Sequence, residues 1–343
     1  MSEGRFFSVF EGKAVRPPPI WLMRQAGRYL PEYKALRAKT GSFWSMCMNP
    51  EVSAELTLQP IRRFGFDAAV IFSDIFVLTA ALGVGVEYEE GFGPRVARVV
   101  SEKELVHDEA LWTRTTAPVY EALGRVRSAL PDETALIGFA GAPWTLVTYL
   151  AQGHGTDDQR AAKLWGYRDP AGLDALLDRL ADAAADHLIG QLRAGADVVQ
   201  IFESWASGLT AESFARWVIA PNKKIVAKVR TEYPKAKIIG FPRATTLAGY
   251  ERYLEETGVD AISVDTSTPI VWAARTLGRR VVVQGNLDPI ALIAGGVALR
   301  EAVDRILDAT KDTRFIFNLG HGILPETPIA HVEELVARVR RPR

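Results

Sequence analysis

Short runs of apolar residues alternate along the chain with longer stretches whose apolar positions recur every three or four residues. The short runs are rich in β-branched or aromatic residues and end at glycine, proline or a polar residue, as buried strands do. They predict seven strands, at Asp67–Ser73, Ala135–Ala140, Asp197–Phe202, Lys237–Phe241, Asp260–Val264, Arg280–Gln284 and Arg314–Asn318. Helical periodicity marks the stretches between them, as in Leu173–Arg193 and Ala211–Tyr233, with helix starts at Pro170 and Thr210. This alternation favours a parallel sheet with crossover helices.

Seven strands are one fewer than a (β/α)8 barrel requires. The eighth could come from Pro19–Met23 or from the long segment 74–134, although Gly91–Val100 within that segment has the pattern of a hairpin. The pattern does not decide between these two sources. No glycine–serine linker, low-complexity tract or repeat interrupts the chain. Residues 1–343 are therefore predicted to form a single distorted (β/α)8 barrel domain with a short N-terminal extension.

A doubly wound open sheet is the alternative architecture. Gly138–Gly141 lacks the G-x-G-x-x-G fingerprint of dinucleotide binding, and the sequence contains no G-x-x-x-x-G-K-[ST] loop. Nucleotide binding, which often accompanies such a sheet, therefore loses its usual sequence support.

Charge and composition limit the kinds of partner. Hydrophobic residues make up 48% of the 343 residues, and lysine plus arginine equal aspartate plus glutamate at 41 each. This balance argues against a protein that binds nucleic acid or anionic lipid through its overall field, so an anionic ligand must meet a local basic cluster. No run of about 18 uncharged apolar residues occurs, and residues 1–13 lack the apolar core of a signal peptide. We therefore expect no membrane span and a cytoplasmic location.

Metal chemistry has little support in the sequence. Cys47 is the only cysteine, so neither an intrachain disulfide nor a multi-cysteine zinc or iron–sulfur site can form. No two of the five histidines have the spacing of metal ligands on one helix, and no H-E-x-x-H motif is present. A Ser/His/Asp triad stays open, although there is no G-x-S-x-G motif. We expect no metal site.

The carboxyl ends of the predicted strands carry polar residues, and in a barrel these ends line the active site. They are Ser73-Asp74, Gly141–Tyr149, Glu203-Ser204, Pro242-Arg243, Asp265-Thr266, Gly285–Asp288 and Gly320–Gly322. The mouth of the barrel is therefore predicted to be polar, mixed in charge and rich in glycine.

Arg24 and Arg28 are a candidate anion-binding pair near the N-terminus. On a helix their guanidinium groups would share a face and repel by roughly a few tenths of a kcal/mol, and Gly27 would cost about 1 kcal/mol more. A bound carboxylate or phosphate would offset the repulsion, because guanidinium groups bind either anion in bidentate fashion. A solvated basic turn without a ligand explains the pair equally well.

Four further side chains are candidates with competing structural explanations. Asp74 follows the apolar run Ala68–Phe72 and is expected at the edge of a dry core, but it could instead cap the next helix. His321 lies between two glycines, although histidines more often serve the core or the surface. Tyr149 and Ser204 are weaker candidates, because buried hydroxyl groups near strand ends usually satisfy backbone groups.

Two long segments of unusual composition resemble the signatures of a known family. Met23–Tyr33 is similar to the first signature of uroporphyrinogen decarboxylase, and Gly138–Tyr149 is similar to the second. Shorter blocks resemble further family blocks in the expected order, at Phe72–Ile75, Phe202–Ser204, Gly285–Pro289 and Asn318–Gly322. The resemblance extends from residue 20 to residue 330.

This resemblance implies a single distorted (β/α)8 TIM barrel, a homodimer whose clefts face each other, and no cofactor or metal. The substrate would be uroporphyrinogen, whose four acetate side chains become methyl groups to give coproporphyrinogen in heme biosynthesis. Residue by residue, the resemblance implies active-site roles for Arg24, Arg28, Asp74, Tyr149, Ser204 and His321, and cleft-lining positions for Gln25, Phe139 and Phe202. Glu203 falls at a position that varies within the family.

The chemistry explains why such residues would be needed. Loss of carbon dioxide from an acetate leaves two electrons on carbon, and without pyridoxal or thiamine the electron sink must lie in the substrate. A protonated pyrrole ring can accept them as an iminium-like cation. Asp74 would stabilise that cation at the pyrrole N–H groups, since an ionised carboxylate has roughly four lone-pair sites. Arg24 and Arg28 would bind substrate carboxylates, and one of them could relay a proton, although arginine is a very poor acid.

The remaining residues would have supporting roles under this hypothesis. Tyr149 would orient an arginine or Asp74, and Ser204 and His321 would position substrate carboxylates. Three other functions stay open. A related barrel that transfers methyl groups from corrinoid proteins uses zinc held by histidine and cysteines, for which Cys47 alone is too few. A non-catalytic tetrapyrrole carrier would need only the arginines, and a phosphate-binding sugar enzyme on the same fold has the least support.

Overall fold

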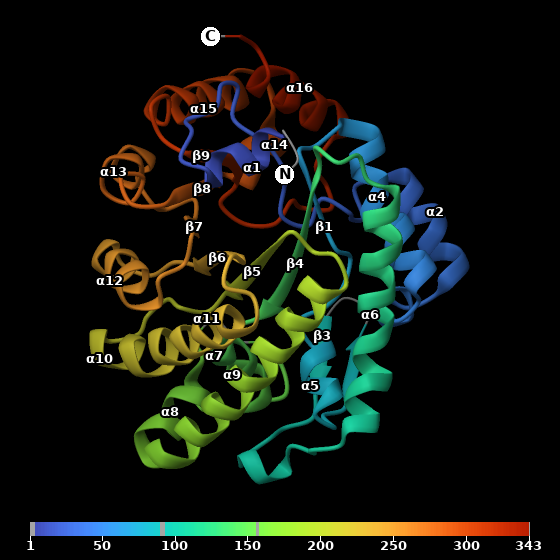
Figure 1. Cartoon of the computed structure of the whole chain (residues 1–343), viewed down its shortest axis with the longest axis vertical. Helices are drawn as coiled ribbons and strands as arrows, with labels where there is room; N and C mark the ends of the chain where they lie inside the picture. The colour runs from blue at the N-terminus through green and yellow to red at the C-terminus, as the bar shows by residue number, and fades with distance from the viewer. Residues whose placement is uncertain (1–3, 90–92, 156–157, 343) are drawn as a thin grey trace.

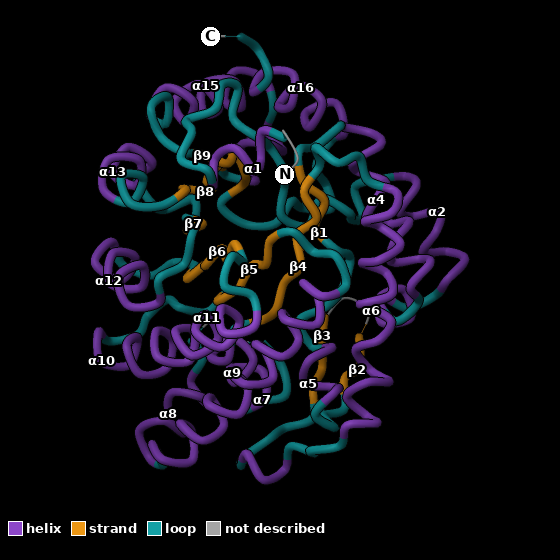
Figure 2. Tube along the Cα trace, in the orientation of Figure 1, coloured by secondary structure: helices purple, strands orange, loops and turns teal. Residues whose placement is uncertain are grey.

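A curled parallel sheet forms the centre of the protein. The computed structural model describes residues 4–89, 93–155 and 158–342. Within them the sheet has seven strands in the order β1-β4-β5-β6-β7-β8-β9, and β2 and β3 form a separate antiparallel hairpin (Figures 1 and 2). The strands are β1 (Ala68–Val70), β2 (Val86–Glu89), β3 (Gly93–Val96), β4 (Ala135–Gly141), β5 (Val198–Glu203), β6 (Lys237–Pro242), β7 (Ala261–Ser263), β8 (Val282–Leu287) and β9 (Phe315–Leu319). Because this order follows the chain without a reversal, the doubly wound alternative is wrong.

Helices cover the outside of the curled sheet, from α4 and α6 round to α15 and α16 (Figure 1). They are α1 (Arg5–Phe10), α2 (Pro31–Thr40), α3 (Phe43–Cys47), α4 (Pro50–Phe64), α5 (Val77–Ala81), α6 (Glu109–Ala129), α7 (Pro143–Leu150), α8 (Arg160–Arg168), α9 (Pro170–Arg193), α10 (Ala211–Ser213), α11 (Ala220–Glu232), α12 (Leu247–Thr257), α13 (Ile270–Thr276), α14 (Pro289–Ala294), α15 (Gly296–Ala309) and α16 (Ile329–Val339). A 3-10 helix spans Glu102–Glu104 and a π-helix spans Phe214–Ile219. Among the described residues, none of the helices combines the length and the apolar character needed to cross a bilayer.

All seven predicted strands are confirmed, with ends that shift by at most three residues. The strand predicted at Asp67–Ser73 shortens the most, since only Ala68–Val70 is strand. The backbone of Phe72 is instead bound by side chains of α4, since the Ser53 hydroxyl donates to its carbonyl at 2.6 Å and its N–H donates to Thr57 Oγ1 at 2.8 Å. The predicted hairpin near Gly91–Val100 is also confirmed in its described part, as β2 and β3, although residues 90–92 lie outside the described residues.

The two predicted crossover helices are present, and one of them is interrupted. Pro170 is the first residue of α9, and the Thr210 side chain caps α10 by accepting from the Ser213 N–H at 3.1 Å. Between α10 and α11 the hydrogen bonds change to the π pattern over Phe214–Ile219. Pro221 follows this turn and has no N–H to donate, which accounts for a local break in the α-helical ladder.

Pro19–Met23 lies between the two outer strands of the sheet, β9 and β1. The Phe317 N–H donates to the Pro19 carbonyl at 2.8 Å, and the Asp67 N–H donates to the Ile20 carbonyl at 2.9 Å. Ile20 makes an isolated parallel bridge with Phe317. This contact is shorter than a strand because residues 17–19 are prolines, which donate no hydrogen bonds, and because the chain turns away after Met23. The sheet therefore has seven strands among the described residues and not the eight that a complete barrel requires.

A buried chain of side-chain hydrogen bonds crosses the inside of the sheet. Trp21 Nε1 donates to Gln284 Oε1 at 2.9 Å, and Gln284 Nε2 donates to Gln200 Oε1 at 3.1 Å. All three side chains have no solvent exposure. Gln200 lies on β5 and Gln284 on β8, three positions apart in the strand order, so the two side chains meet only because the sheet is strongly curled.

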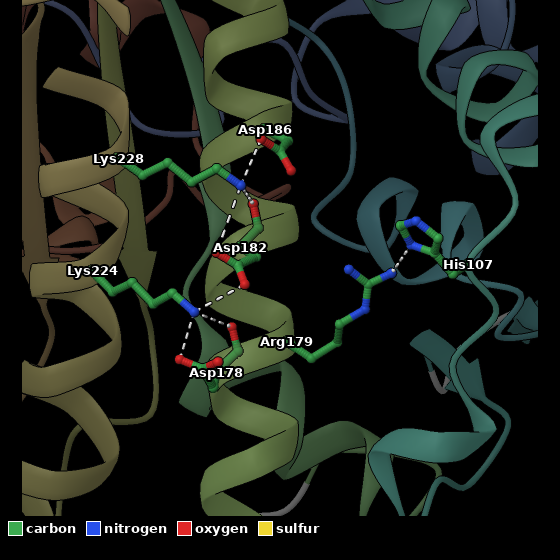
Figure 3. A network of polar contacts seen from close by, with 7 residues as sticks. All are labelled: His107, Asp178, Arg179, Asp182, Asp186, Lys224 and Lys228. Carbon is green, nitrogen blue, oxygen red and sulfur yellow. Dashed lines mark hydrogen bonds and ion pairs between the residues drawn. The ribbon is translucent and has the colours of Figure 1, made fainter. Parts of the chain in front are cut away.

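On the outside, a ladder of charges joins α9 to α11 (Figure 3). Aspartates at every fourth residue of α9 face two lysines of α11, with Lys224 bound to Asp178 at 2.6 Å and to Asp182 at 2.9 Å, and Lys228 bound to Asp186 at 2.8 Å. On the other side of α9, the Arg179 guanidinium contacts His107 Nδ1 at 2.8 Å. Each partly exposed pair is worth up to about 1 kcal/mol. The ladder therefore sets the alignment of the two helices more than it stabilises the fold.

Removing one donor from the buried chain should destabilise the protein. Trp21→Phe leaves Gln284 Oε1 without its indole partner, and a buried acceptor that loses its hydrogen bond costs roughly 1–3 kcal/mol. We expect the free energy of unfolding, measured by urea denaturation, to fall by about that amount. A double-mutant cycle with Gln284→Met should show non-additivity, because the two side chains share one bond. Additive losses would contradict the coupling.

Candidate functional site

The carboxyl ends of several strands bring the predicted polar residues to one edge of the sheet. Asp74 follows β1, Tyr149 lies on α7 after β4, Ser204 follows β5, and His321 follows β9. Arg24 joins them from the segment that runs beside β9. Its side chain lies over Gly322, where a Cβ atom would come within 2.3 Å of Arg24 Cδ. Glycine at position 322 therefore makes room for the arginine.

The Arg24 backbone is held in an unusual conformation. Its φ angle is 61°, in the left-handed region that residues other than glycine rarely adopt. Residues 23 and 24 form a turn, and residues 24–28 are not helical. The Met23 N–H donates to Asn318 Oδ1 at 2.9 Å, and the Ile323 N–H donates to the Met23 carbonyl at 2.9 Å. These bonds on both sides of the His321 loop hold Arg24 against that loop.

Asp74 is held through one of its carboxylate oxygens. Its Oδ1 accepts the Phe76 N–H at 2.7 Å, so the carboxylate closes the turn before α5. Asp74 is not the N-cap of α5, since that position is Phe76 and no side chain caps the helix. Burial raises the pKa of Asp74, while the Tyr88 hydroxyl, the Phe76 N–H and the Arg24 charge oppose the rise. The bond to the backbone fixes the orientation of the carboxylate and leaves Oδ2 for other contacts.

The Arg24 side chain is exposed at the edge of the sheet, although several titratable groups lie close to it. Its partial removal from water lowers its pKa, the charges of Tyr149 and Asp74 raise it, and Arg243 lowers it further. Arg24 therefore lies within electrostatic reach of a carboxylate, a phenol and a second guanidinium. A guanidinium remains charged under all ordinary conditions, so the site holds a permanent cation.

Arg28 is not part of this group in the structure. It is exposed, and it forms no hydrogen bond or ion pair with any residue that the structure describes. Its charge acts on Tyr33. Burial raises the pKa of Tyr33, Cys47 raises it slightly further, and the charges of Arg37 and Arg28 lower it. Because residues 24–28 form turns, the two arginines do not share a helix face.

His321 is neutral in its surroundings. Burial together with the charges of Arg24 and Arg243 lowers its pKa to about 3, against a smaller opposing effect of Asp265. A neutral imidazole offers one N–H donor and one acceptor. At physiological pH the ring can therefore donate a hydrogen bond to an anion without adding charge.

Aromatic side chains surround the polar groups. Phe139 and Phe202, at the ends of β4 and β5, meet edge to face with ring centroids 5.6 Å apart, and both are only half-buried. Tyr149 packs edge to face against Phe76 at 5.0 Å. Burial raises the pKa of Tyr149, so its hydroxyl stays protonated. The site thus presents flat apolar surfaces beside its charges.

Gln25 has a structural position. Its side chain has no solvent exposure, its Nε2 donates to the Ala68 carbonyl at 3.1 Å, and its Oε1 accepts the Leu22 N–H at 3.1 Å. Both ends of the amide are therefore used to tie the N-terminal segment to β1. This geometry favours a role in placing Arg24 over direct contact with a ligand.

Sequence reasoning placed Arg243 at the mouth of the barrel without giving it a role, and it missed Tyr88. Arg243 directly follows β6, and its guanidinium donates to the Ser204 carbonyl at 3.3 Å while its charge acts on both Arg24 and His321. A charged residue at a strand end was the available signal for Arg243. Nothing in the sequence pattern could indicate Tyr88, since it reaches Asp74 from the separate hairpin.

Glu203 is a buried carboxyl directly beside the site. The Thr145 hydroxyl donates to its Oε1, Asn222 Nδ2 lies 3.5 Å from its Oε2, and the side chain has no solvent exposure. Thr145 Oγ1 also accepts the Ser204 N–H at 2.8 Å, so the cluster joins the end of β5 to α7. Burial raises the pKa of Glu203 to about 8, against the hydrogen bonds from Thr145 and Asn222.

The fold and the site together define an α/β enzyme that works at the carboxyl ends of parallel strands, with fixed positive charge for an acidic ligand. The family model described as uroporphyrinogen decarboxylase matches residues 1–342. The chain belongs to the uroporphyrinogen decarboxylase family.

Individual relatives agree with this assignment. The chain is 51% identical to a protein named uroporphyrinogen decarboxylase from Chelativorans sp. (strain BNC1), over all of both chains. It is 50% identical to one of the same name from Brucella anthropi, over 97% of each chain. Among solved structures, a methyltransferase from Methanosarcina mazei superposes with a TM-score of 0.80 at 21% identity, covering 98% of this chain and 97% of that one. At that identity the likeness concerns the fold alone.

The alternative of zinc chemistry requires a set of metal ligands. Among the described residues, no group of three or more His, Cys, Asp or Glu side chains could hold a metal ion. Cys47 is fully buried, and burial raises the pKa of its thiol.

Replacing Glu203 should change how stability depends on pH. Because its pKa is higher in the folded protein than in the unfolded chain, the group favours folding below about pH 4.5, and this contribution is lost as pH rises through about 8. We expect the wild-type free energy of unfolding to fall by up to several kcal/mol between pH 5 and pH 9 on this account, and Glu203→Gln to fall much less. Urea denaturation at both pH values measures the difference. The exposed Glu301→Gln serves as the control and should keep the wild-type slope.

Proposed function

We propose that the protein removes the carboxyl groups from the four acetate side chains of uroporphyrinogen, giving coproporphyrinogen in heme biosynthesis. The enzyme would be a carboxy-lyase that uses the pyrrole ring of its substrate as electron sink, without a cofactor or metal. The observation that carries this proposal is the Asp74 carboxylate, anchored by the Phe76 N–H with Arg24 in electrostatic reach, in a chain that belongs to this family.

The reaction can be written around Asp74. A proton adds to the ring carbon next to the one that bears the acetate, and the positive charge spreads over the nitrogen and the acetate-bearing carbon. The bond to the carboxylate then breaks, its electron pair forms an exocyclic double bond, and carbon dioxide leaves. A proton on the exocyclic carbon makes the methyl group, and loss of the first proton restores the pyrrole. Each acetate thus consumes one proton.

Asp74 would stabilise the cation that forms in this sequence. The carboxylate must be ionised to do so, and its pKa is raised by burial. Electrostatic stabilisation of this kind is strongest where water is excluded and the charge is already in place. The bond from Phe76 to Oδ1 is the kind of preorganisation that this role requires.

The substrate carboxylates would meet Arg24, Arg243, Ser204 and the neutral His321 at the strand ends. The charge of Arg243 lowers the pKa of Arg24, so an anionic ligand bound to both would relieve their repulsion. The half-buried rings of Phe139 and Phe202 would face the flat macrocycle, and Tyr149 would orient Arg24 or Asp74. For Arg28 and Gln25, contact with substrate stays a prediction that rests on the family resemblance.

We also propose that Pro19–Met23 completes the sheet as the eighth element of a single distorted (β/α)8 barrel domain spanning residues 1–343. Its hydrogen bonds to Phe317 on one side and to Asp67 on the other support this closure. The homodimer with facing clefts and the cytoplasmic location stay predictions.

Turnover of uroporphyrinogen under anaerobic, reducing conditions tests the function. We expect the wild type to yield a product with four fewer carboxyl groups, as counted by mass spectrometry. Asp74→Asn keeps the size of the side chain but removes its charge, and it should lower kcat/KM by at least about 100-fold. The exposed Asp132→Asn is the control and should match the wild type. Binding without loss of carboxyl groups would instead identify a carrier, and near-full activity of Asp74→Asn would refute the role of Asp74.

Substitution of the arginines should separate their roles. Arg24→Ala removes the guanidinium that lies closest to the reacting groups, so we expect a higher KM and a lower kcat, with kcat/KM down by roughly 100-fold. Arg243→Gln should chiefly raise KM, because its proposed contact is with a substrate carboxylate. Steady-state kinetics of the two variants and of Arg28→Ala measure these effects. Unchanged kinetics in Arg28→Ala would mean that this arginine belongs to a solvated turn.

A further inference from the structure

Tyr88 enters the neighbourhood of Asp74 from outside the curled sheet. It lies on β2, in the hairpin that β2 and β3 form apart from the main sheet. Its ring packs against α3, with ring centroids 5.1 Å from Phe43 and 6.3 Å from Trp44, and the Trp44 ring is stacked on it. Phe43 in turn contacts Phe72 at 5.4 Å. Since Phe72 is two residues before Asp74, this aromatic cluster holds Tyr88 in a fixed position beside the end of β1.

The Tyr88 hydroxyl is buried and has no hydrogen-bond partner among the described residues. It is nevertheless close enough to Asp74 to lower the pKa of that carboxyl in the way a hydrogen-bond donor does, so the two groups are near neighbours. A buried hydroxyl without a partner costs free energy and is uncommon in native proteins. Burial and the neighbouring Asp74 raise the pKa of Tyr88 far above its usual value, so the hydroxyl remains a proton donor in a hydrogen bond at any physiological pH.

The other groups around Asp74 come from different elements. Arg24 approaches from the N-terminal segment, Tyr149 from α7, and the Cys47 thiol from α3. The Phe76 N–H already occupies Oδ1 of Asp74. Of these groups, Tyr88 combines a rigid ring with a donor that is still unpaired, which makes it the natural partner for Oδ2.

We propose that Tyr88 is a positioning residue for Asp74, whose hydroxyl donates to Oδ2 once the carboxylate engages the substrate. With Oδ1 bound by the Phe76 N–H and Oδ2 by Tyr88, the carboxylate would be fixed in one rotamer and kept ionised. This inference rests on the proposed function, since it assigns Tyr88 a part in the same reaction. The hairpin would thereby contribute to the site from outside the strand ends.

Tyr88→Phe removes the hydroxyl and keeps the ring that packs on Phe43 and Trp44. A carboxylate that loses a donor is harder to ionise, so its pKa rises. We expect the acid limb of the kcat/KM profile to move upward by about one pH unit, and kcat/KM at neutral pH to fall roughly tenfold, mainly in kcat. Tyr120→Phe is the matched control, because it removes a hydroxyl bonded to His187 at 3.1 Å away from the site. The control should keep the wild-type profile.

A second readout does not depend on turnover. Carbon-13 NMR titration of labelled aspartate, with the Asp74 signal assigned from Asp74→Asn, should give a higher pKa for Asp74 in Tyr88→Phe than in the wild type. If the wild type failed to decarboxylate uroporphyrinogen while this shift was present, the proposed function would be wrong and the Tyr88–Asp74 contact would stand. An unchanged Asp74 pKa would overturn the inference, and so would a rise in KM alone, which would mean that Tyr88 contacts the substrate directly.

Discussion

The hydrogen-bond chain from Trp21 through Gln284 to Gln200 is the contact on which the arrangement of the site depends. It lies across the dry interior of the curled sheet and attaches the N-terminal segment to strands from the far end of the sequence. A polar group in such a place is stable only if it is paired, so the segment has one favourable position. Because Arg24 follows Trp21 by three residues, the position of its guanidinium depends on this interior chain and on the bonds of Met23 to Asn318 and Ile323.

Burial acts on the charged groups of the site in ways that serve the proposed chemistry. It raises the pKa of Asp74 and lowers those of Arg24 and His321. A carboxylate that is costly to ionise in the free protein gains the most when a cation forms beside it, because that cation replaces the lost water. His321 is neutral for the same reason, which lets it contact a substrate carboxylate without competing with the arginines for charge. Glu203 precedes Ser204 in the chain and belongs to the cluster that joins β5 to α7. Its side chain has no solvent exposure, and this burial raises its pKa.

The positions of several candidate residues differ from what the sequence motifs suggested. Arg24 and Arg28 looked equivalent in the sequence, and both are exposed, but the turns after Met23 direct only Arg24 over Gly322. Gln25 lies between them in the sequence, and both ends of its side-chain amide form hydrogen bonds with the backbone. The closeness of Arg243 to His321, in contrast, is visible only in the structure, where the ends of β6 and β9 lie at the same edge of the sheet. Neighbours along a turn point in different directions, so proximity in the chain says little about a shared site.

Local patterns were sufficient for much of this protein. All seven strands, the main helices and the hairpin follow from apolar periodicity and turn residues, because these depend on contacts within a few residues. The strand-end rule also placed Asp74, Ser204 and His321 at one edge of the sheet, where the structure has them, while their roles stay predictions. Local patterns could not predict that Pro19–Met23 lies between β9 and β1, that Arg24 and Arg28 separate, or that Tyr88 approaches Asp74. Each depends on contacts between segments far apart in the chain, such as Ile20 with Phe317, and the energies that decide them exist only once the sheet has curled and its interior is dry.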